Sequence, residues 1–184
     1  KTDSFNKLIS FSCDITKEDE LVNVSKYLKE NDIILDMIIN VAGIHKMASF
    51  VENDFKDMKK VIDVNLLGTM CVNKTFYPYL SKTGRIIITT SEVASFPPLP
   101  YNGLYSVSKI ALDAYAQGLR QELNLLGQKV ITIRPGAVDT NLSSGSVLDT
   151  NKLVNDTILY KKQSVHFSNL VSKFTGKKIK PEKL

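Results

Sequence analysis

The chain has 184 residues, of which 43% are hydrophobic and 23% charged, and its formal net charge is +5. This length fits one domain, which we place at residues 1–184. The lysines are dispersed, and no apolar run approaches the roughly 18 residues that a membrane-spanning helix needs. We therefore expect neither a nucleic-acid partner nor a membrane span.

Cysteine and histidine are scarce. Cys13 and Cys71 lie far apart in apolar sequence, so we expect two reduced core thiols, a reducing compartment and a cytoplasmic protein. His45 and His166 lack the spacing of metal ligands, so we predict surface or loop positions for both and no metal site.

Short apolar runs alternate with amphipathic ones in the first half of the chain. We predict a strand at 8–12, followed by a helix that opens at Thr16-Lys17-Glu18-Asp19, which resembles a capping box. A strand that is apolar throughout, as if covered on both faces, follows at 35–41. A long helical tract at 54–80 comes next, with Gly84 as its stop signal.

The second half continues the alternation. We predict a strand at 85–90, a proline-containing loop at 97–100, an amphipathic helix at 105–126 and a strand at 129–134. Gly127 follows the helix at a position that tolerates a left-handed backbone. This order predicts an α/β fold, a doubly wound parallel sheet of Rossmann-like type with helices on both faces.

Ligands in such sheets bind beyond the carboxyl ends of the strands. The residues that follow the predicted strands are small, polar or glycine-rich, unlike the strands themselves: Asp14, residues 40–43, Ser91 and residues 135–140. We therefore expect the chemistry of the protein to lie among these residues.

Tyr105 and Lys109 are four residues apart, which places both on one face of the predicted helix. A phenol ionises near a pKa of about 10, and a nearby ammonium favours the phenolate and lowers that pKa. The pair therefore predicts a general acid/base for an alcohol or a ketone.

In chain order, Asn40-Val41-Ala42-Gly43, Asn65, Ser91, Tyr105-x-x-x-Lys109 and Pro135-Gly136-x-x-x-Thr140 resemble the short-chain dehydrogenase/reductase family. The resemblance covers the chain from Asp14 to Thr140, with Val41 standing where the family commonly has a second Asn. It implies an oxidoreductase that uses NAD or NADP to move a hydride between the nicotinamide and an alcohol or ketone.

The resemblance also implies catalytic roles. Tyr105 would exchange a proton with the substrate oxygen, and Lys109 would lower the pKa of Tyr105 and hold the nicotinamide ribose. Ser91 would hydrogen-bond the substrate oxygen. Asn65 would interrupt the helical hydrogen bonding and hold a water that links Lys109 to solvent.

The position of the serine departs from the family pattern. The family usually places it thirteen residues before the tyrosine, whereas Ser91 lies fourteen before Tyr105. Glu92 occupies the usual position and cannot play this part, and the proline-rich loop can absorb one residue. We therefore choose Ser91, with Ser95 and Thr90 as alternatives.

The cofactor contacts that the resemblance implies form three groups. Asp14 and the backbone of Ile15 would contact the adenine ring, and Asn40, Ala42 and Gly43 would line the adenine ribose. The nicotinamide end would be held by Tyr105 and Lys109 together with Pro135, Gly136, Val138 and Thr140.

The family's glycine-rich phosphate loop has no counterpart before Leu8. We therefore expect a sheet that is incomplete at the N-terminus, and the residue that selects NAD or NADP lies outside the sequence. Residues 141–180 are expected to form a mobile lid whose apolar side chains favour an apolar substrate.

Two other functions compete with this one. A sugar-nucleotide epimerase or dehydratase would share the tyrosine and lysine, but residues 40–43 and 135–140 argue against it. A catalytically silent cofactor-binding protein would have no use for the full catalytic set. We also expect a homodimer or homotetramer through the helices that bear Asn65 and Tyr105, with Tyr115 as an exposed apolar residue.

Overall fold

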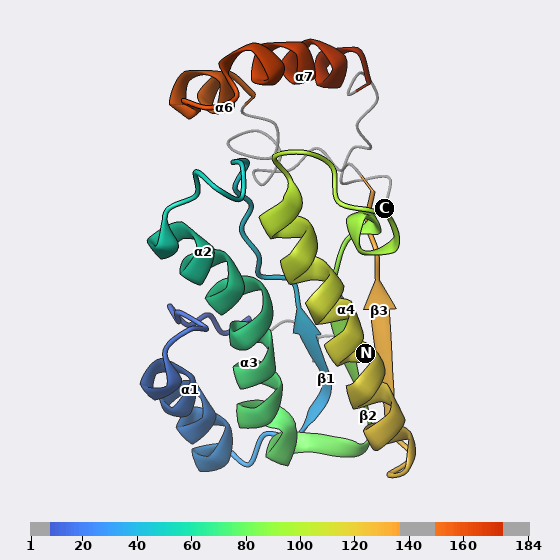
Figure 1. Cartoon of the computed structure of the whole chain (residues 1–184). Helices are drawn as coiled ribbons and strands as arrows, with labels where there is room; N and C mark the ends of the chain where they lie inside the picture. Colours follow the sequence, from blue (N-terminus) through green and yellow to red (C-terminus); the bar gives the residue numbers. More distant parts are fainter. Residues whose placement is uncertain (1–7, 137–149, 175–184) are drawn as a thin grey trace.

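The computed structural model describes residues 8–136 and 150–174. In these residues three parallel strands form a sheet in the order β1-β2-β3 (Figure 1). The strands are β1 (Leu35–Asn40), β2 (Leu80–Thr89) and β3 (Lys129–Ile133). The predicted parallel α/β sheet is confirmed.

Helices connect and cover the strands. They are α1 (Glu18–Glu30), α2 (Phe55–Ile62), the π-helix η1 (Asp63–Gly68), α3 (Thr69–Phe76), α4 (Gly103–Asn124), α6 (Thr150–Asp156) and α7 (Lys161–Phe174), with short 3-10 turns η2 (Tyr77–Tyr79) and η3 (Glu92–Ser95). In Figure 1, α3 and α4 lie across one face of the sheet, and α6 and α7 lie beyond the carboxyl ends of the strands.

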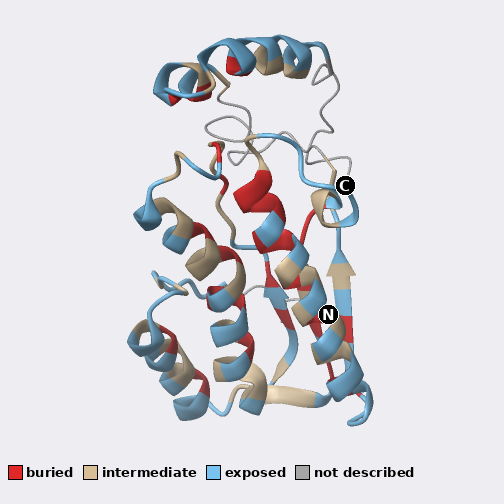
Figure 2. Ribbon diagram, in the orientation of Figure 1, coloured by how far each residue is buried: buried red, intermediate tan, exposed pale blue. Residues whose placement is uncertain are grey.

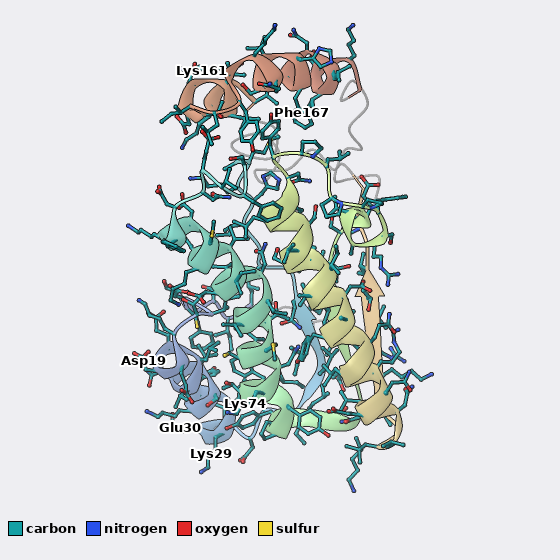
Figure 3. All side chains as sticks on the ribbon, in the orientation of Figure 1. Asp19, Lys29, Glu30, Lys74, Lys161 and Phe167 are labelled. Atoms are coloured by element: carbon teal, nitrogen blue, oxygen red, sulfur yellow. The ribbon has the colours of Figure 1, made fainter. Side chains whose placement is uncertain are left out.

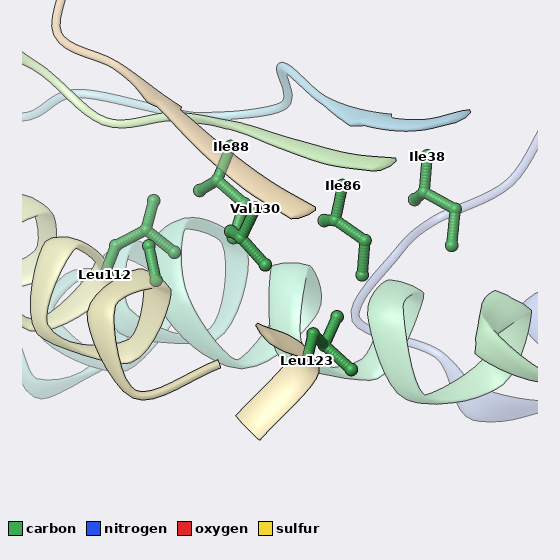
Figure 4. Close-up of a cluster of buried hydrophobic side chains, with 7 residues drawn as sticks. Ile38, Ile86, Ile88, Leu112, Leu123 and Val130 are labelled. Carbon is green, nitrogen blue, oxygen red and sulfur yellow. The ribbon is translucent and has the colours of Figure 1, made fainter. Parts of the chain in front are cut away.

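The hydrophobic core lies between the sheet and these helices. Alternate side chains of the strands point to this face and meet the apolar stripe of α4 (Figure 4). The buried cluster consists of Ile38, Ile86, Ile88, Leu112, Ala116, Leu123 and Val130. Its side chains hold the middle and the last turns of α4, from Leu112 to Leu123, against the sheet.

The opposite face of the sheet is exposed. Met37 and Ile39 of β1 keep 47% and 57% of their surface, and Ile131 and Ile133 of β3 are similarly open. In the described residues, therefore, helices cover one face of the sheet rather than the two that we expected. Most of the buried positions in Figure 2 lie between the layers.

Several predicted boundaries are wrong. Residues 8–12 form no strand, and α1 begins at Glu18 without a side-chain cap, because Thr16 hydrogen-bonds Asp14 instead. Gly84 does not stop a helix. It lies inside β2, where the pairing with β1 shifts register between Leu80 and Arg85. The expected left-handed backbone at Gly127 is present, with φ at +77°.

Two further observations bear on the predicted environment. Among the described helices, none has the length and apolar character to cross a bilayer. Cys13 and Cys71 are both free thiols, but Cys13 is only partly buried and Cys71 is exposed, so the expectation of two core thiols is wrong.

Candidate active site

Tyr105 and Lys109 lie in the first turns of α4, where the helix passes the carboxyl end of β2. Both are buried, with 8% and 3% of their surface exposed. The Lys109 Nζ lies 5.9 Å from the centroid of the Tyr105 ring and donates to the carbonyl oxygen of Thr89 at 3.1 Å. The expected pair therefore faces the interior at the end of β2.

Ser91 follows β2 and brings a hydroxyl to the same place. Its side chain accepts from the Val93 N–H and lies close enough to the Tyr105 phenol to lower the pKa of that group. The alternatives do not compete: the Thr90 hydroxyl is directed to Asp113 and to the Ile133 carbonyl, and Ser95 is exposed in η3. Of the three candidates, the described contacts bring Ser91 to the phenol.

Asn65 lies in the π-helix η1, which accounts for the expected interruption of helical hydrogen bonding. Its side chain is fully buried. The amide oxygen accepts from the Ile44 N–H at 2.7 Å, and the amide nitrogen donates to the Ile44 carbonyl at 2.8 Å and to Ser108 at 2.9 Å. Asn65 thus binds the loop after β1 to α4.

Gly43 lies beside both the Asn65 amide and the Lys109 amine. A Cβ at this position would be 3.4 Å from both Asn65 Oδ1 and Lys109 Nζ. A side chain here would therefore press on two polar groups of the site, which explains a glycine at the end of the loop segment 40–43.

Burial governs the ionisation of the pair. It raises the pKa of Tyr105, and the Ser91 hydroxyl opposes this only in part. Burial also lowers the pKa of Lys109 to about 8. Our expectation of a lowered pKa for Tyr105 is wrong for this arrangement, because desolvation of the phenol outweighs the favourable contact. At neutral pH the phenol is a proton donor.

The residues expected at the adenine end surround a pocket of about 380 Å³ beside the carboxyl end of β1. Ile15, Asn40 and Ala42 line it. The exposed Asp14 lies next to Ile15, and its carboxylate accepts hydrogen bonds from the backbone and hydroxyl of Thr16, which lower its pKa. The described structure thus gathers three predicted residues, Ile15, Asn40 and Ala42, around one pocket.

The Asn40 side chain also has a structural partner that we had not predicted. Its amide nitrogen donates to Asn73 Oδ1 at 2.8 Å, and Asn73 donates to the Tyr115 hydroxyl at 3.2 Å. Tyr115 packs against the core, so it is not the exposed apolar residue that we expected. A buried polar chain thus joins β1, α3 and α4.

Pro135 and Gly136 lie beside the end of β2. The Pro135 carbonyl accepts from the Glu92 N–H at 2.9 Å, and a Cβ at Gly136 would be 3.0 Å from the Glu92 carboxylate. Val138 and Thr140, together with 141–149 and 175–180 of the expected lid, lie outside the described residues.

His45 is a site residue that sequence reasoning missed. We expected it at the surface, but only 8% of its surface is exposed. Its Nε2 lies 2.6 Å from Asn102 Oδ1, and its ring packs against Tyr105 with the centroids 4.6 Å apart. His166 is exposed on α7, as predicted.

Comparisons with known proteins agree with this geometry. The family described as short chain dehydrogenase matches residues 2–151. The NADPH-dependent 1-acyldihydroxyacetone phosphate reductase of Schizosaccharomyces pombe is 33% identical over 74% of this chain and 47% of its own length. The short-chain dehydrogenase srdE of Neurospora crassa is 30% identical over 88% of this chain and 55% of its own. The chain belongs to the short-chain dehydrogenase family.

A solved structure shows the same fold. A short chain dehydrogenase family protein from Francisella tularensis superposes with a TM-score of 0.75 at 23% identity, over 94% of this chain and 69% of that one. The chain spans about half the length of the curated relatives it matches.

Proposed function

We propose that the protein is an NAD(P)-dependent oxidoreductase that transfers a hydride between a nicotinamide and an alcohol or ketone. The observation that carries the proposal is that Tyr105, Lys109 and Ser91 are buried together at the end of β2, with the Lys109 Nζ 5.9 Å from the centroid of the Tyr105 ring. The matched relatives are named as a reductase and a dehydrogenase, which favours this reaction over a sugar-nucleotide epimerase. The name of the yeast relative favours NADPH.

The residues fit a nicotinamide dinucleotide. The glycine at position 43 places no side chain against the Asn65 amide or the Lys109 amine. Ile15, Asn40 and Ala42 would hold the adenine end in their pocket, and Pro135 and Gly136 would hold the nicotinamide end. Asp14, Val138 and Thr140 are proposed as further contacts. The bound cofactor would supply or accept the hydride.

The protein side chains would carry out the proton transfer. The Ser91 hydroxyl holds the substrate oxygen beside the Tyr105 phenol, and in reduction the phenol donates its proton to that oxygen. The raised pKa of Tyr105 keeps the phenol protonated at neutral pH. The charged Lys109 beside the ring stabilises the phenolate that remains.

The environment of the site supports three further parts of the proposal. Helices α6 and α7 belong to the segment 141–180, which we propose as the lid over an apolar substrate. The helices that bear Asn65 and Tyr105 are proposed as the surface of a homodimer or homotetramer. The two free thiols suit a reducing compartment such as the cytoplasm.

Turnover by the full-length protein that contains this chain tests the proposal. We expect oxidation of NADPH or NADH, followed by nicotinamide absorbance, with members of a ketone panel that runs from small polar to long apolar compounds. Tyr105→Phe removes the proton donor and should lower kcat by roughly 10²–10⁴-fold.

Tyr79→Phe is the matched control, because Tyr79 lies in η2 directly before β2, at the opposite end of that strand from Ser91. It should leave kcat unchanged. A Tyr105→Phe variant as active as the wild type would refute the proposed role of the phenol. A silent cofactor-binding protein would bind the nicotinamide and turn over none of the ketones.

A further inference from the structure

His45 is a buried titratable side chain that the proposed mechanism does not use. It lies in the loop after β1, and its ring meets the Tyr105 ring edge to face, with an interplanar angle of 61°. With the Asn102 amide oxygen as the acceptor, the imidazole Nε2 carries the proton and donates it over 2.6 Å. Two residues from the start of α4 thus hold one imidazole.

The loop around His45 is fixed on both sides. On one side, the Asn65 side chain binds both the N–H and the carbonyl of Ile44. On the other side, the Ala48 N–H donates to the Tyr101 carbonyl at 2.9 Å. The position of the imidazole is therefore set by the same elements that build the site.

Asn102 holds the imidazole instead of capping the helix. It is the N-cap residue of α4, and asparagine is among the best helix caps because its side chain accepts from the first free N–H groups. Here the side chain makes no cap hydrogen bond and accepts from His45 instead. The contact thus replaces a helix cap only three residues before Tyr105.

We propose that His45 is a positioning residue for Tyr105: anchored by Asn102, its imidazole packs against the phenol ring and fixes the direction in which the hydroxyl points. This inference rests on the proposed function, because Tyr105 is the proton donor there. Lys109 Nζ lies over the Tyr105 ring at 5.9 Å from its centroid, and the His45 ring packs against it with the centroids 4.6 Å apart, so His45 completes the enclosure of the phenol. Small misplacements of a reacting group are costly in rate.

The test compares His45→Ala and His45→Phe in the full-length protein, with His166→Ala as the exposed control. His45→Ala removes both the ring contact and the anchor, and it should lower kcat for ketone reduction about tenfold or more. His45→Phe keeps the ring contact and should lose less. In both variants the KM for NADPH should stay within about twofold of the wild type, because His45 is not among the proposed cofactor contacts.

The pH profile separates positioning from simple packing. Two titratable groups face the Tyr105 ring, His45 from the loop and Lys109 from its own helix, and Lys109 is intact in every variant. His45→Ala admits water to the phenol, so the alkaline limb of kcat should shift to lower pH. His45→Phe still excludes water from the Tyr105 phenol, so the alkaline limb of its kcat profile should stay at the wild-type pH.

A His45→Ala variant with wild-type kcat, or one that loses activity only through KM with an unshifted limb, overturns the inference. If His45→Ala does not fold, Asn102→Ala replaces it and is compared with His45→Phe. A wild-type kcat in both of these variants would overturn the inference. Failure of the proposed function shows separately as an inactive wild type. In that case tyrosinate absorbance replaces kcat as the readout. The part of the tyrosinate signal that is missing in Tyr105→Phe belongs to Tyr105, and it should appear at lower pH in His45→Ala than in the wild type.

Discussion

Lys109 carries a positive charge in a place almost closed to water. Its Nζ is held by the Thr89 carbonyl, and burial lowers its pKa from 10.5 to about 8. The folded protein therefore keeps the ammonium at a free-energy cost at neutral pH. Such a cost is expected where a charge serves the chemistry of a site rather than the stability of the fold.

Replacing Lys109 with Met should expose this cost. Between pH 8 and 10.5 the unfolded chain binds more protons at this residue than the folded one, so wild-type stability rises with pH through that window. Lys109→Met should remove the rise and increase the free energy of unfolding at pH 7 by about 1–3 kcal/mol while activity is lost. Urea unfolding at pH 7 and pH 10 measures both effects.

Lys26→Met on α1 provides the control, since Lys26 is exposed and the same change there removes an amine in contact with water. Its unfolding free energy should show the wild-type dependence on pH. Equal or lower stability of Lys109→Met at pH 7 would show that the hydrogen bond to Thr89 outweighs the desolvation of the amine.

The proximity of Ser91 and Tyr105, which we propose as catalytic residues, was predictable because the first follows a strand and the second opens a helix. Parallel strands end at one edge of the sheet, so Ser91 and Tyr105 had to meet there. His45 was not predictable: its burial depends on Asn102, which lies 57 residues away. The raised pKa of Tyr105 was missed for a similar reason, because the degree of burial is a property of the packed site.

The helical tract after β1 has three parts with different tasks. The wide turn η1 interrupts the helix at Asp63–Gly68 and carries Asn65 inward, whereas the regular segments α2 and α3 flank it. Asparagine within an apolar stretch was the signal for this interruption, and the tract at 54–80 was predicted as one helix. The π-helix is therefore the element that ties the loop after β1 to the rest of the site.

Asn65→Ala should loosen this connection. It removes three hydrogen bonds and leaves the N–H and carbonyl of Ile44 without their side-chain partner, which should lower the free energy of unfolding by about 2–4 kcal/mol. Asn23→Ala on α1 makes the same change at an exposed position and should cost far less. Urea unfolding of the pair measures the difference, and similar losses in both would contradict the role of Asn65.

The predicted strand boundaries were wrong where pairing with a neighbouring strand, rather than the local apolar pattern, decides the structure. Residues 8–12 have the apolar character of a strand, yet Leu8 is 93% exposed and no strand forms there. A strand requires a hydrogen-bonding neighbour, which a local pattern cannot reveal. Conversely, β2 begins before Gly84 because Leu80 pairs with Leu35 of β1.

At the scale of the whole molecule, one carboxylate joins the two described segments of the chain, residues 8–136 and 150–174. Glu52 accepts from the Thr157 hydroxyl at 2.6 Å and from the N–H groups of Ile158 and Leu159 at 2.7 and 2.8 Å. Ser49 adds a fourth hydrogen bond at 3.0 Å. The connection between α6 and α7 is thus held to the loop that also carries His45.

Aromatic side chains reinforce this contact on the same side. The Tyr101 ring packs edge to face against Tyr160 and Phe167, with centroids 5.8 and 5.2 Å away. Figure 3 shows Phe167 on the side of α7 that faces the body of the molecule. Since Tyr101 lies just before α4, the helical pair is positioned relative to the helix that bears Tyr105.

Glu52→Gln should release the α6–α7 connection while keeping the shape of the side chain. The hydrogen bonds lower the pKa of Glu52 from 4.5 to about 2, so their stabilisation is complete above pH 4.5 and is lost as the pH falls toward 2. At pH 7, the amides of Ile158 and Leu159 should therefore exchange hydrogen faster in Glu52→Gln than in the wild type. Hydrogen exchange followed by mass spectrometry measures this directly.

The matched control is Glu30→Gln, which changes an exposed carboxylate at the end of α1. It should leave the exchange of residues 157–160 unchanged. If α6 and α7 form the lid over the substrate, Glu52→Gln should also raise the KM for the ketone and leave the KM for NADPH unaltered, because Glu52 holds the lid and touches none of the proposed cofactor contacts. Unchanged exchange in Glu52→Gln would mean that the aromatic contacts of Tyr101 suffice to hold the helical pair.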